Sequence, residues 1–512
     1  MNRRRFLQTL GAAAGLAPWL ARRSLRASQP PTSGEGRYSG DEASFIHRYL
    51  RDGDSVETPQ PEPGRIFDAI VVGGGVAGVA ATYKLRDMDV LLIEKDRTIG
   101  GVSKKEVWEG IEYPIGAAYI GGTDPGSALD KFYRELGLHK EWRKTSEQEE
   151  ALFTGGELIR DFWKNHPDFT PAREYFKQLL ENRYPDIPFT GQSGWSRDQY
   201  LAMDRANFSD WLARGIGKTG RPYPPLLLSV IDCYCRAAFC AGLKELSAWA
   251  GLNFFLADMG SSFVLPGGNA RVVERMAERI EGAKPGRIVA GRAVVRVAAK
   301  NKRWLVTTAS ADGKFSTYEA RAVVVALPKF VAARVVDGIP SAQLGAISQI
   351  RTRPYLVVNG LFRRRLLPDI YGGYTLPGNP FTDLGVAEFA SRSPSGKSVL
   401  ALYYPMTEAQ RGKLLLDDSF AGFQAQARTA FQSILAGQRM KPEDLLDVKL
   451  TRWGHAVPYP RPGQISSGLF EAASKPARGL WYCGQDSDGT PCIETALQSA
   501  FEAAASVRKH LS

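Results

Sequence analysis

The chain has 512 residues, of which 44% are hydrophobic and 23% are charged, an ordinary balance for a globular protein. This length suggests two domains rather than one simple core. The net charge is +12, but residues 1–27 carry six Arg and no acid, so the rest of the chain carries +6 and gives no reason to expect nucleic-acid binding. Beyond the N-terminus no run of 18 apolar residues occurs, so we expect no integral membrane span in the mature chain.

The N-terminus is predicted to be a targeting signal rather than part of the fold. The segment NRRRFLQ at residues 2–8 resembles a bacterial twin-arginine signal, and a weakly apolar stretch follows over residues 10–21. We expect residues 1–27 to be a signal peptide for the twin-arginine translocation machinery and the protein to be periplasmic or otherwise exported. A basic tail on a cytoplasmic protein is the alternative. Residues 28–64 are rich in Pro, Ser, Gly and Glu and predict a linker, with one short helix near residues 43–51.

Residues 67–94 contain a complete strand–turn–helix–strand unit. An apolar strand over residues 67–72 ends in a Gly-x-Gly-x-x-Gly pattern, and a helix is predicted from there to about residue 86. A second strand covers residues 90–93 and ends at Glu94, 21 residues after Gly73. Because strand, glycines, helix, second strand and acid occur together, the unit predicts a dinucleotide-binding site.

Each part of this unit has a physical role. Gly73 permits a tight turn, Gly75 lets a pyrophosphate approach the backbone, and Gly78 lets helix and strand pack closely. Val76 and Ala77 lie at the helix N-terminus, where free N–H groups and the positive end of the dipole favour phosphate. The Glu94 carboxylate is expected to accept hydrogen bonds from a ribose 2′-hydroxyl.

The residues after Glu94, EKDRTIGGVS over 94–103, and six later segments resemble the FAD-dependent flavin amine oxidase superfamily. The six segments occur in the family's order: IGAA at 115–118, LPGGN at 265–269, VVRV at 294–297, VVVALP at 323–328, LWYCGQD at 480–486 and IETALQSA at 493–500. This resemblance covers most of the chain, and it identifies the superfamily much more specifically than the substrate.

The resemblance implies FAD as the cofactor and a set of residues that hold it. The expected contacts beyond the first turn come from Lys95, Gly100, Gly101, Val102, Val294, Gly484, Gln485, Asp486 and Ile493. The family's acid usually follows the glycine of the 480–486 segment directly, and here Gln485 occupies that place, so either Gln485 or Asp486 serves. The monoamine oxidases bind flavin through a Cys after a Trp-containing segment, which here reads RWGHAVPYP over 452–460 and has no Cys, so the FAD is expected to be noncovalent.

The fold class implied by the resemblance is α/β, with a Rossmann-like FAD-binding domain built from discontinuous segments and an inserted α+β substrate-binding domain. The FAD domain is expected from residues 65–150, 255–340 and 465–510. The substrate domain is expected from residues 151–254, which look helical and aromatic, and 341–464, which contain strand-like runs at 355–362 and 399–404.

The catalytic residues are less well defined by the sequence. Many amine-oxidising members have a Lys near the flavin, at the place that Val357 occupies here. Trp453, His455 and Tyr459 lie in a Trp-x-x-Ala-x-Pro pattern closer to protoporphyrinogen oxidases and carotenoid desaturases, and they are candidates for a wall of the substrate pocket. No essential side-chain base is expected, and a substrate amine would lose its proton to water or to His455, with a titration near the substrate's pKa or about 6.5.

The predicted function is therefore an FAD-dependent oxidation, amine oxidase-like, that removes a hydride from an amine or a related C–N or C–C bond of a small-molecule substrate. Oxygen or another electron acceptor would reoxidise the flavin. A carotenoid- or porphyrinogen-type enzyme, a non-redox flavin isomerase and a binding-only protein like the GDP-dissociation inhibitors remain as alternatives.

The chain has five Cys, an odd number that argues against a disulfide framework. Cys233, Cys235 and Cys240 lie in or just after an apolar helix predicted over residues 226–239, with no His nearby and no second Cys pair. We expect buried structural thiols there and no metal site.

Overall fold

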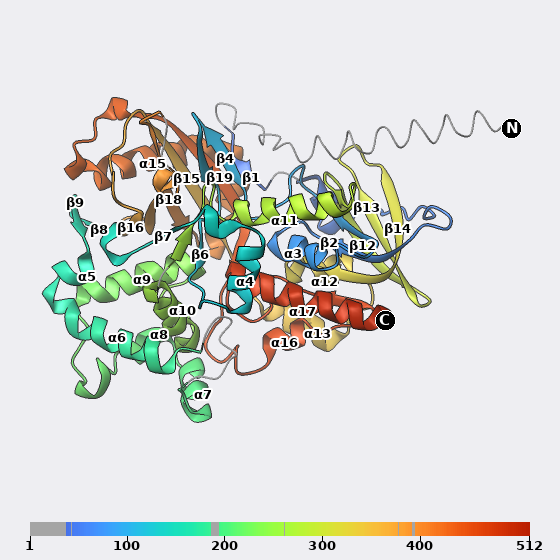
Figure 1. Ribbon diagram of the computed structural model, residues 1–512, viewed down its shortest axis with the longest axis horizontal. Helices are drawn as coiled ribbons and strands as arrows, with labels where there is room; N and C mark the ends of the chain where they lie inside the picture. The colour runs from blue at the N-terminus through green and yellow to red at the C-terminus, as the bar shows by residue number, and fades with distance from the viewer. Residues whose placement is uncertain (1–36, 42–43, 186–193, 261, 377, 392–394) are drawn as a thin grey trace.

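The computed structural model describes residues 37–41, 44–185, 194–260, 262–376, 378–391 and 395–512. The predicted signal peptide and the first part of the predicted linker lie outside the described residues. The described chain forms two large sheets that lie side by side, each covered by helices (Figure 1). This is the α/β class that the sequence predicts.

Seven strands of the described chain form a sheet with a parallel centre. In spatial order they are β11 (Ile288–Val289), β3 (Val90–Ile93), β2 (Ile66–Val72), β14 (Phe315–Val325), β13 (Arg303–Ala309) and β12 (Ala293–Lys300), with β20 (Leu480–Tyr482) paired to β14. Strand β2 pairs in parallel with β3 and β14. Residues 69–72 of β2 have no exposed surface, because both faces of the sheet are covered.

Helices pack on both faces of this sheet. One apolar layer joins the sheet to α3 (Val76–Lys84), α4 (Ala128–Glu135), α11 (Ala270–Ala283) and α17 (Ile493–Leu511). The opposite layer includes α12 (Lys329–Val335), with α2 (His47–Leu50), α13 (Ser341–Gln349) and α16 (Leu469–Ala473) nearby. The predicted strand–turn–helix–strand unit is present, and its helix ends at Lys84, slightly before the predicted residue 86.

The second sheet has eight described strands. In spatial order they are β1 (Ser39–Gly40), β19 (Leu445–Pro458), β15 (Thr352–Phe362), β18 (Ser398–Pro405), β17 (Asp383–Val386), β16 (Gly372–Leu376), β8 (Glu150–Thr154) and β9 (Glu157–Arg160). Strands β15 and β18 confirm the two strand-like runs of the sequence. One face of this sheet packs on α14 (Arg411–Leu415) and α15 (Phe420–Ile434).

A helical layer lies beside the other face of this sheet (Figure 1). It comprises α5 (Phe162–Asn165), α6 (Thr170–Arg183), α7 (Arg197–Arg205), α8 (Phe208–Leu212), α9 (Pro225–Phe239) and α10 (Ala248–Gly260). The aromatic side chains predicted for this segment form its core. The predicted boundary between residues 254 and 255 falls inside α10, because one continuous apolar helix crosses it.

The predicted linker is partly structured. Residues 44–50 form a 3-10 turn and α2, near the helix expected at 43–51. Strand β1 pairs in parallel with β19, so this part of the segment belongs to the larger sheet. No apolar pattern in the sequence predicts β1, because this strand is held through its backbone. Gly40 has a φ of +104°, and a Cβ there would overlap the carbonyl oxygen of Arg452.

Two smaller sheets join the halves. One contains β6 (Tyr119–Gly121), β10 (Ser262–Val264) and β7 (Arg143–Lys144), and the other is the hairpin of β4 (Lys105–Trp108) and β5 (Ile111–Pro114). No helix in the described ranges is long and apolar enough to cross a membrane.

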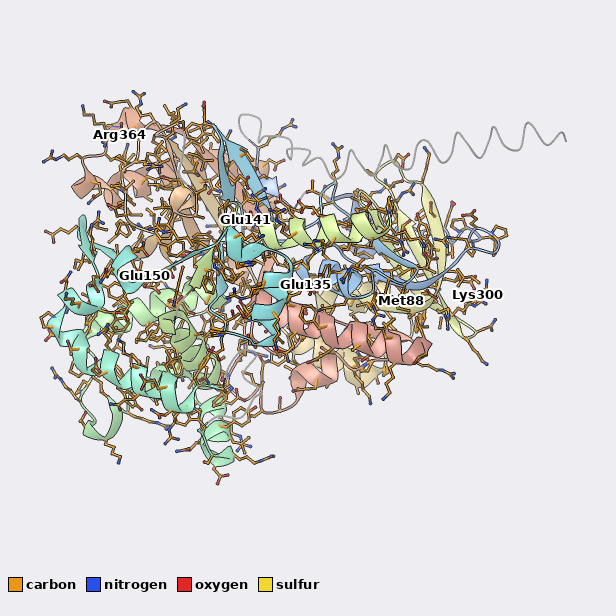
Figure 2. The ribbon with its side chains drawn as sticks, in the orientation of Figure 1. Met88, Glu135, Glu141, Glu150, Lys300 and Arg364 are labelled. Carbon is orange, nitrogen blue, oxygen red and sulfur yellow. The ribbon has the colours of Figure 1, made fainter. Side chains whose placement is uncertain are left out.

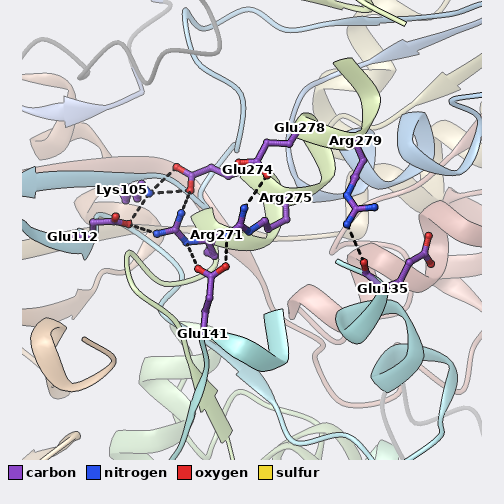
Figure 3. A network of polar contacts seen from close by, with 9 residues as sticks. All are labelled: Lys105, Glu112, Glu135, Glu141, Arg271, Glu274, Arg275, Glu278 and Arg279. Carbon is purple, nitrogen blue, oxygen red and sulfur yellow. Dashed lines mark hydrogen bonds and ion pairs between the residues drawn. The ribbon is translucent and has the colours of Figure 1, made fainter. Parts of the chain in front are cut away.

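A network of ion pairs fixes the β4–β5 hairpin to α11 (Figure 3). Arg271 lies within 2.8 Å of Glu112, 3.0 Å of Glu274 and 3.2 Å of Glu141, and its side chain is only 16% exposed. Lys105 joins Glu112 and Glu274 from the hairpin. Since β5 leads directly into residues 115–118, this network positions the glycine turn that the sequence places near the flavin.

We expect Arg271→Gln to lower the free energy of unfolding by about 1.5–3 kcal/mol, because three carboxylates lose their shared cation and two of them, Glu112 and Glu274, lose a charged hydrogen bond. The control is Arg296→Gln, which breaks a solvent-exposed pair with Asp337 and should change stability by no more than about 0.5 kcal/mol. Urea unfolding measures both. Equal losses would contradict a special role for the network.

Candidate active site

The turn after β2 is built on glycine because its backbone leaves no room for side chains. Gly73 has a φ of +101°, and a Cβ there would lie 2.6 Å from the carbonyl oxygen of Ala326. A Cβ on Gly78 would overlap the carbonyl oxygen of Gly73. At Gly75 a Cβ would meet only the Cα of Gly101, at 3.9 Å. Gly75 therefore borders open space at the N-terminus of α3, where the sequence predicts a pyrophosphate.

Glu94 lies across from this turn at the end of β3. Its carboxylate accepts hydrogen bonds from the backbone N–H groups of Gly74, at 2.6 Å, and Asp96, at 2.8 Å. Each oxygen keeps a second acceptor position for a ribose hydroxyl. Lys95 pairs with Asp96 instead of reaching into the turn.

A second pair of glycines meets the first turn. Gly100 donates its N–H to the carbonyl of Gly74 at 2.7 Å, and Gly101 packs against the Cα of Gly75. Both have positive φ, +128° and +59°. Val102 then accepts a backbone hydrogen bond from Ala117. The two glycine turns thus form one cradle of backbone, as a close-approaching phosphate requires.

The remaining predicted cofactor contacts lie around this cradle. The backbone N–H of Arg292, two residues before Val294 in the chain, donates to the carbonyl of Glu94 at 2.9 Å. Gln485 donates from its side chain to the carbonyl of Ala456 at 2.7 Å. Ile493 begins α17, whose N-terminus has no side-chain cap.

Asp486 is bound to Lys329. One carboxylate oxygen accepts the backbone N–H of Lys329 at 2.7 Å and the other accepts its ammonium at 2.9 Å, in a buried ion pair. Asp486 therefore anchors the turn after β20 to the start of α12. Between the two candidates left open by the sequence, Gln485 is the one whose side chain faces β19.

The three predicted wall residues have separate surroundings. Trp453 is buried in an apolar cluster with Ile115, to whose carbonyl its indole N–H donates at 2.8 Å. Tyr459 packs under the guanidinium of Arg353, with 4.4 Å from the guanidinium carbon to the ring centroid. Of the three, Trp453 is the one in contact with the 115–118 turn.

His455 has its own partners, Thr352 at 2.9 Å and the ring of Phe330. His455 is exposed to solvent, yet desolvation by the surrounding protein, followed by the charge of Arg411, lowers its pKa to about 4. A lowered pKa favours the neutral imidazole over the titration near 6.5 that the sequence suggested.

The sheet carries a row of polar side chains toward the 115–118 turn. Strand register places Tyr374, Asp383, Tyr403 and Val357 directly opposite one another on β16, β17, β18 and β15, so they share one face. The hydroxyl of Tyr403 donates to the carbonyl of Gly116 at 3.3 Å. This row connects the turn near the predicted flavin to the interior of the second half.

Tyr119, Tyr371 and Asp258 lie beside this row, and together with Tyr374, Asp383 and Tyr403 they form the group of residues that we call the chamber. Tyr119 and Tyr371 approach with ring centroids 6.5 Å apart, and Asp258 of α10 accepts a hydrogen bond from Tyr374 at 2.8 Å. The Tyr119 side chain is 39% exposed, yet burial raises the pKa of its phenol well above 10. A side chain that is both accessible and surrounded by protein faces an interior space.

The chamber is acidic. Burial raises the pKa of Asp383 to about 7, and it also raises the pKa of Asp258 and of Glu150. Among the described residues, no Lys or Arg lies within ion-pair distance of these three carboxyls. Figure 2 labels Glu150 in the half of the molecule that contains the eight-stranded sheet. No sequence pattern predicts this grouping, because its members come from strands and helices far apart in the chain.

The comparisons identify the family. Residues 76–508 match the family described as flavin containing amine oxidoreductase. The chain belongs to this family. It is therefore an oxidoreductase of a flavin-containing family, and the binding-only alternative is set aside.

Individual relatives are distant. Over 89% of this chain, 22% of residues are identical to oxidoreductase PigB of Serratia sp. (strain ATCC 39006), of which 78% is covered. The flavin-containing amine oxidase A of Canis lupus familiaris is 23% identical over 53% of this chain and 51% of its own length.

Solved structures share the fold at low identity. Putrescine oxidase bound to putrescine superposes with a TM-score of 0.65 and 17% identity, over 88% of this chain and all of that chain. Cyclohexylamine oxidase from Brevibacterium oxydans IH-35A gives 0.63 and 16%, over 87% and 99%. These likenesses establish the fold.

The cradle fits a flavin dinucleotide. The open space at Gly75, the backbone N–H groups at the start of α3 and the free acceptor positions of Glu94 match a pyrophosphate followed by a ribose.

The Cys residues fit the expectation of structural thiols, because Cys233 and Cys235 are free and buried in α9. The described residues contain no group of three metal-ligating side chains.

We expect Gly75→Ala and Gly78→Ala to behave differently. Alanine fits at Gly75 in the protein itself, so the fold should survive while FAD affinity falls about tenfold or more, because the methyl occupies ligand space. Alanine at Gly78 would overlap Gly73, so stability and FAD should both be lost. Thermal melting and flavin released by acid precipitation measure the two effects. Unchanged FAD affinity in Gly75→Ala would place the pyrophosphate elsewhere.

Proposed function

We propose that the protein oxidises a small amine that binds as a cation in the chamber of Tyr119, Tyr371, Tyr403, Asp258 and Asp383. The observation that carries this proposal is the acidic group of carboxyls and phenols beside the 115–118 turn, where no basic side chain of the described residues pairs with the carboxyls. A cation is the ligand that such a space favours, because it lets desolvated carboxyls ionise. The names of the putrescine and cyclohexylamine oxidases, which share this fold, support an amine substrate.

The bound flavin supplies a two-electron acceptor for the substrate's hydride, and oxygen or another acceptor takes the electrons afterwards. The protein's own part is to exclude water and to hold the amine in place. Trp453 and Tyr403 do this by hydrogen bonds to the carbonyls of Ile115 and Gly116, which fix the turn against the sheet. An extended polyene is disfavoured, because it would leave the chamber's carboxyls desolvated without a counter-charge.

We propose FAD as the flavin, bound without a covalent link. The strand–turn–helix unit with Glu94 supports a dinucleotide rather than a mononucleotide. The segment over 452–460 has no Cys, and burial raises the pKa of the Cys483 and Cys492 thiols, which makes them poor nucleophiles.

We also propose that the parallel sheet and its helices form the FAD domain and that the eight-stranded sheet with the helical layer forms the substrate domain. The segments are those expected from the sequence, 65–150, 255–340 and 465–510 against 151–254 and 341–464, with one boundary moved to the end of α10. The support is that residues 248–256 pack in the helical layer.

A larger side chain that fills the chamber is expected to slow the reaction with amines. A Cβ on Gly385 of β17 would meet only the ring of Tyr403, at 3.9 Å, so the site opens onto free space. Gly385→Leu should keep FAD content and melting temperature but slow anaerobic bleaching of the flavin by alkylamines about tenfold or more, with Gly385→Ala in between.

The control is Gly412→Leu, on the exposed helix α14, which should leave bleaching unchanged. If no amine from a panel of primary and cyclic amines bleaches the wild-type flavin, the proposed function is wrong. If Gly385→Leu bleaches like wild type, the chamber is not the substrate site.

We propose that the protein is exported by the twin-arginine route and that residues 1–27 are its signal peptide. The support is the NRRRFLQ segment, together with the need of a flavoprotein to fold around its cofactor before export. Changing Arg3 and Arg4 together to Lys should retain active flavoprotein in the cytoplasm, because Lys keeps the charge and loses the guanidinium fork. Cell fractionation measures this, and normal export of the double variant would exclude the route.

A further inference from the structure

Polar side chains follow one another from the chamber toward the surface. Asp383 lies directly opposite Tyr374 across β16 and β17, and Tyr374 donates its hydroxyl to Asp258 at 2.8 Å. Asp258 and Tyr374 line a cavity of about 30 Å³ together with Glu150 and Glu147. This space is large enough for a water molecule.

The outermost of these side chains meets solvent. The Glu147 side chain is 29% exposed and forms ion pairs with Arg173 and Lys177 of α6. Glu150 is the first residue of β8, and its side chain has no hydrogen bond or ion pair among the described residues. Carboxyls therefore occur at the chamber, at the small cavity and at the surface. Tyr374 lies opposite Asp383 and is hydrogen-bonded to Asp258, and the small cavity lies between Asp258 and Glu150.

We propose that Asp383 accepts the proton that a bound ammonium must lose before oxidation, and that Asp258 and Glu150 pass this proton through the small cavity to Glu147 at the surface. This inference rests on the proposed amine oxidation. It assigns a proton acceptor where the sequence, with Val357 in place of the family's Lys, gave none.

The chemistry requires such an acceptor. An ammonium nitrogen has no lone pair, so its neighbouring carbon cannot release a hydride until one N–H bond breaks. In the proposed step the N–H proton moves to a carboxylate oxygen of Asp383, and the electron pair stays on nitrogen. The proton then leaves through the carboxyls, and Asp383 becomes ionised again. No electron moves in this part of the reaction.

The surroundings of Asp383 favour reversible protonation. Burial raises its pKa to about 7, a hydrogen bond from Thr382 opposes this rise, and the charge of Asp258 adds to it. Burial also raises the pKa of Asp258. The titratable groups that face these two carboxyls from the packed elements are Tyr119, Glu150, Cys233, Tyr234, Tyr355, Tyr371, Tyr374 and Tyr403. Burial raises the pKa of each phenol and of the thiol, so they stay neutral.

A purely structural role explains this arrangement poorly. Buried carboxyls without a cationic partner cost stability, and an apolar residue of similar size would avoid that cost. Buried groups with pKa values near the working pH are typical of proton transfer.

The decisive experiment is the pH dependence of anaerobic flavin reduction by an alkylamine that reduces the wild-type protein. In wild type the limiting rate should rise with pH through about 7, the pKa of Asp383. In Asp383→Asn this rise should disappear, the rate should instead follow deprotonation of the free amine near about 10, and the rate at pH 7.5 should fall about tenfold or more.

The roles of Asp258 and Glu150 in the proton path are tested by measuring the release of the proton to the solvent. With a pH-indicator dye in weak buffer, Asp258→Asn and Glu150→Gln should delay release behind flavin reduction, whereas wild type should release the proton in step. The matched control is Glu388→Gln, a buried carboxyl bound to Ser398 and Val399 outside the chamber, which should behave as wild type. An unchanged pH profile in Asp383→Asn would overturn the proposal, and undelayed release in both other variants would overturn the path.

A stability measurement separates this inference from the proposed function. Because the folded state raises the pKa of Asp383, the stability that its protonated form provides is fully present below pH 4 and is lost as pH rises through about 7. Asp383→Asn should therefore gain melting temperature over wild type between pH 5 and pH 8. This holds without any substrate. A flat difference would mean that Asp383 does not titrate there, even if amines are oxidised. A protein that passes this test without amine oxidation would show that Asp383 titrates as inferred but that the proposed function is wrong, and with it the proton transfer from an amine.

Discussion

The close approach of Gly78 to Gly73 is the contact on which the rest of the structure depends. It sets the first turn of α3 directly on the backbone that leaves β2, with no side chain between them. The same approach brings Gly75 against the second glycine pair, and α11 and α17 then pack on α3. The cofactor cradle is thus a result of backbone packing, and the side chains around it mainly hold loops in position.

In the half of the molecule that contains the eight-stranded sheet, desolvation determines the protonation of the titratable side chains. This sheet presents phenols and carboxyls to an interior space, and the Tyr403 hydroxyl joins that space to the glycine turn at Gly116. In such a setting the protonation of each carboxyl depends on what occupies the chamber. The charge of the substrate and the charge of these carboxyls are therefore coupled, so the site favours a cationic ligand before any reaction occurs.

The sequence predicted the first half well because its signals are local. The glycines, the apolar strand and Glu94 lie within one short segment, and each has a fixed geometric requirement. The strands at 355–362 and 399–404 followed from their alternation. The chamber was missed because Asp258 and Asp383 are brought together only when Asp258 of α10 bonds to Tyr374 of β16, and no sequence pattern predicts this contact.

Three-dimensional packing that the sequence does not report also decides the positions of the predicted wall residues and of the linker. Trp453, His455 and Tyr459 are close in sequence, but they contact different parts of the protein, and the pairing of β15 with β19 is irregular near Arg353 and Tyr355. The roles of these three residues in substrate binding stay predictions. Strand β1 contains only Ser39 and Gly40, so composition alone makes it indistinguishable from a linker.

Strand β1 also has a consequence for how the chain begins. It occupies the outer edge of β19, the longest strand of its sheet, and Asp41 adds a side-chain hydrogen bond to the N–H of Gly454 at 2.7 Å. An uncovered edge of this kind is a site for pairing with another molecule, and β1 covers it at Thr451 and Arg452. A shortened chain that starts after Asp41 would keep both large sheets and would expose this stretch of the β19 edge.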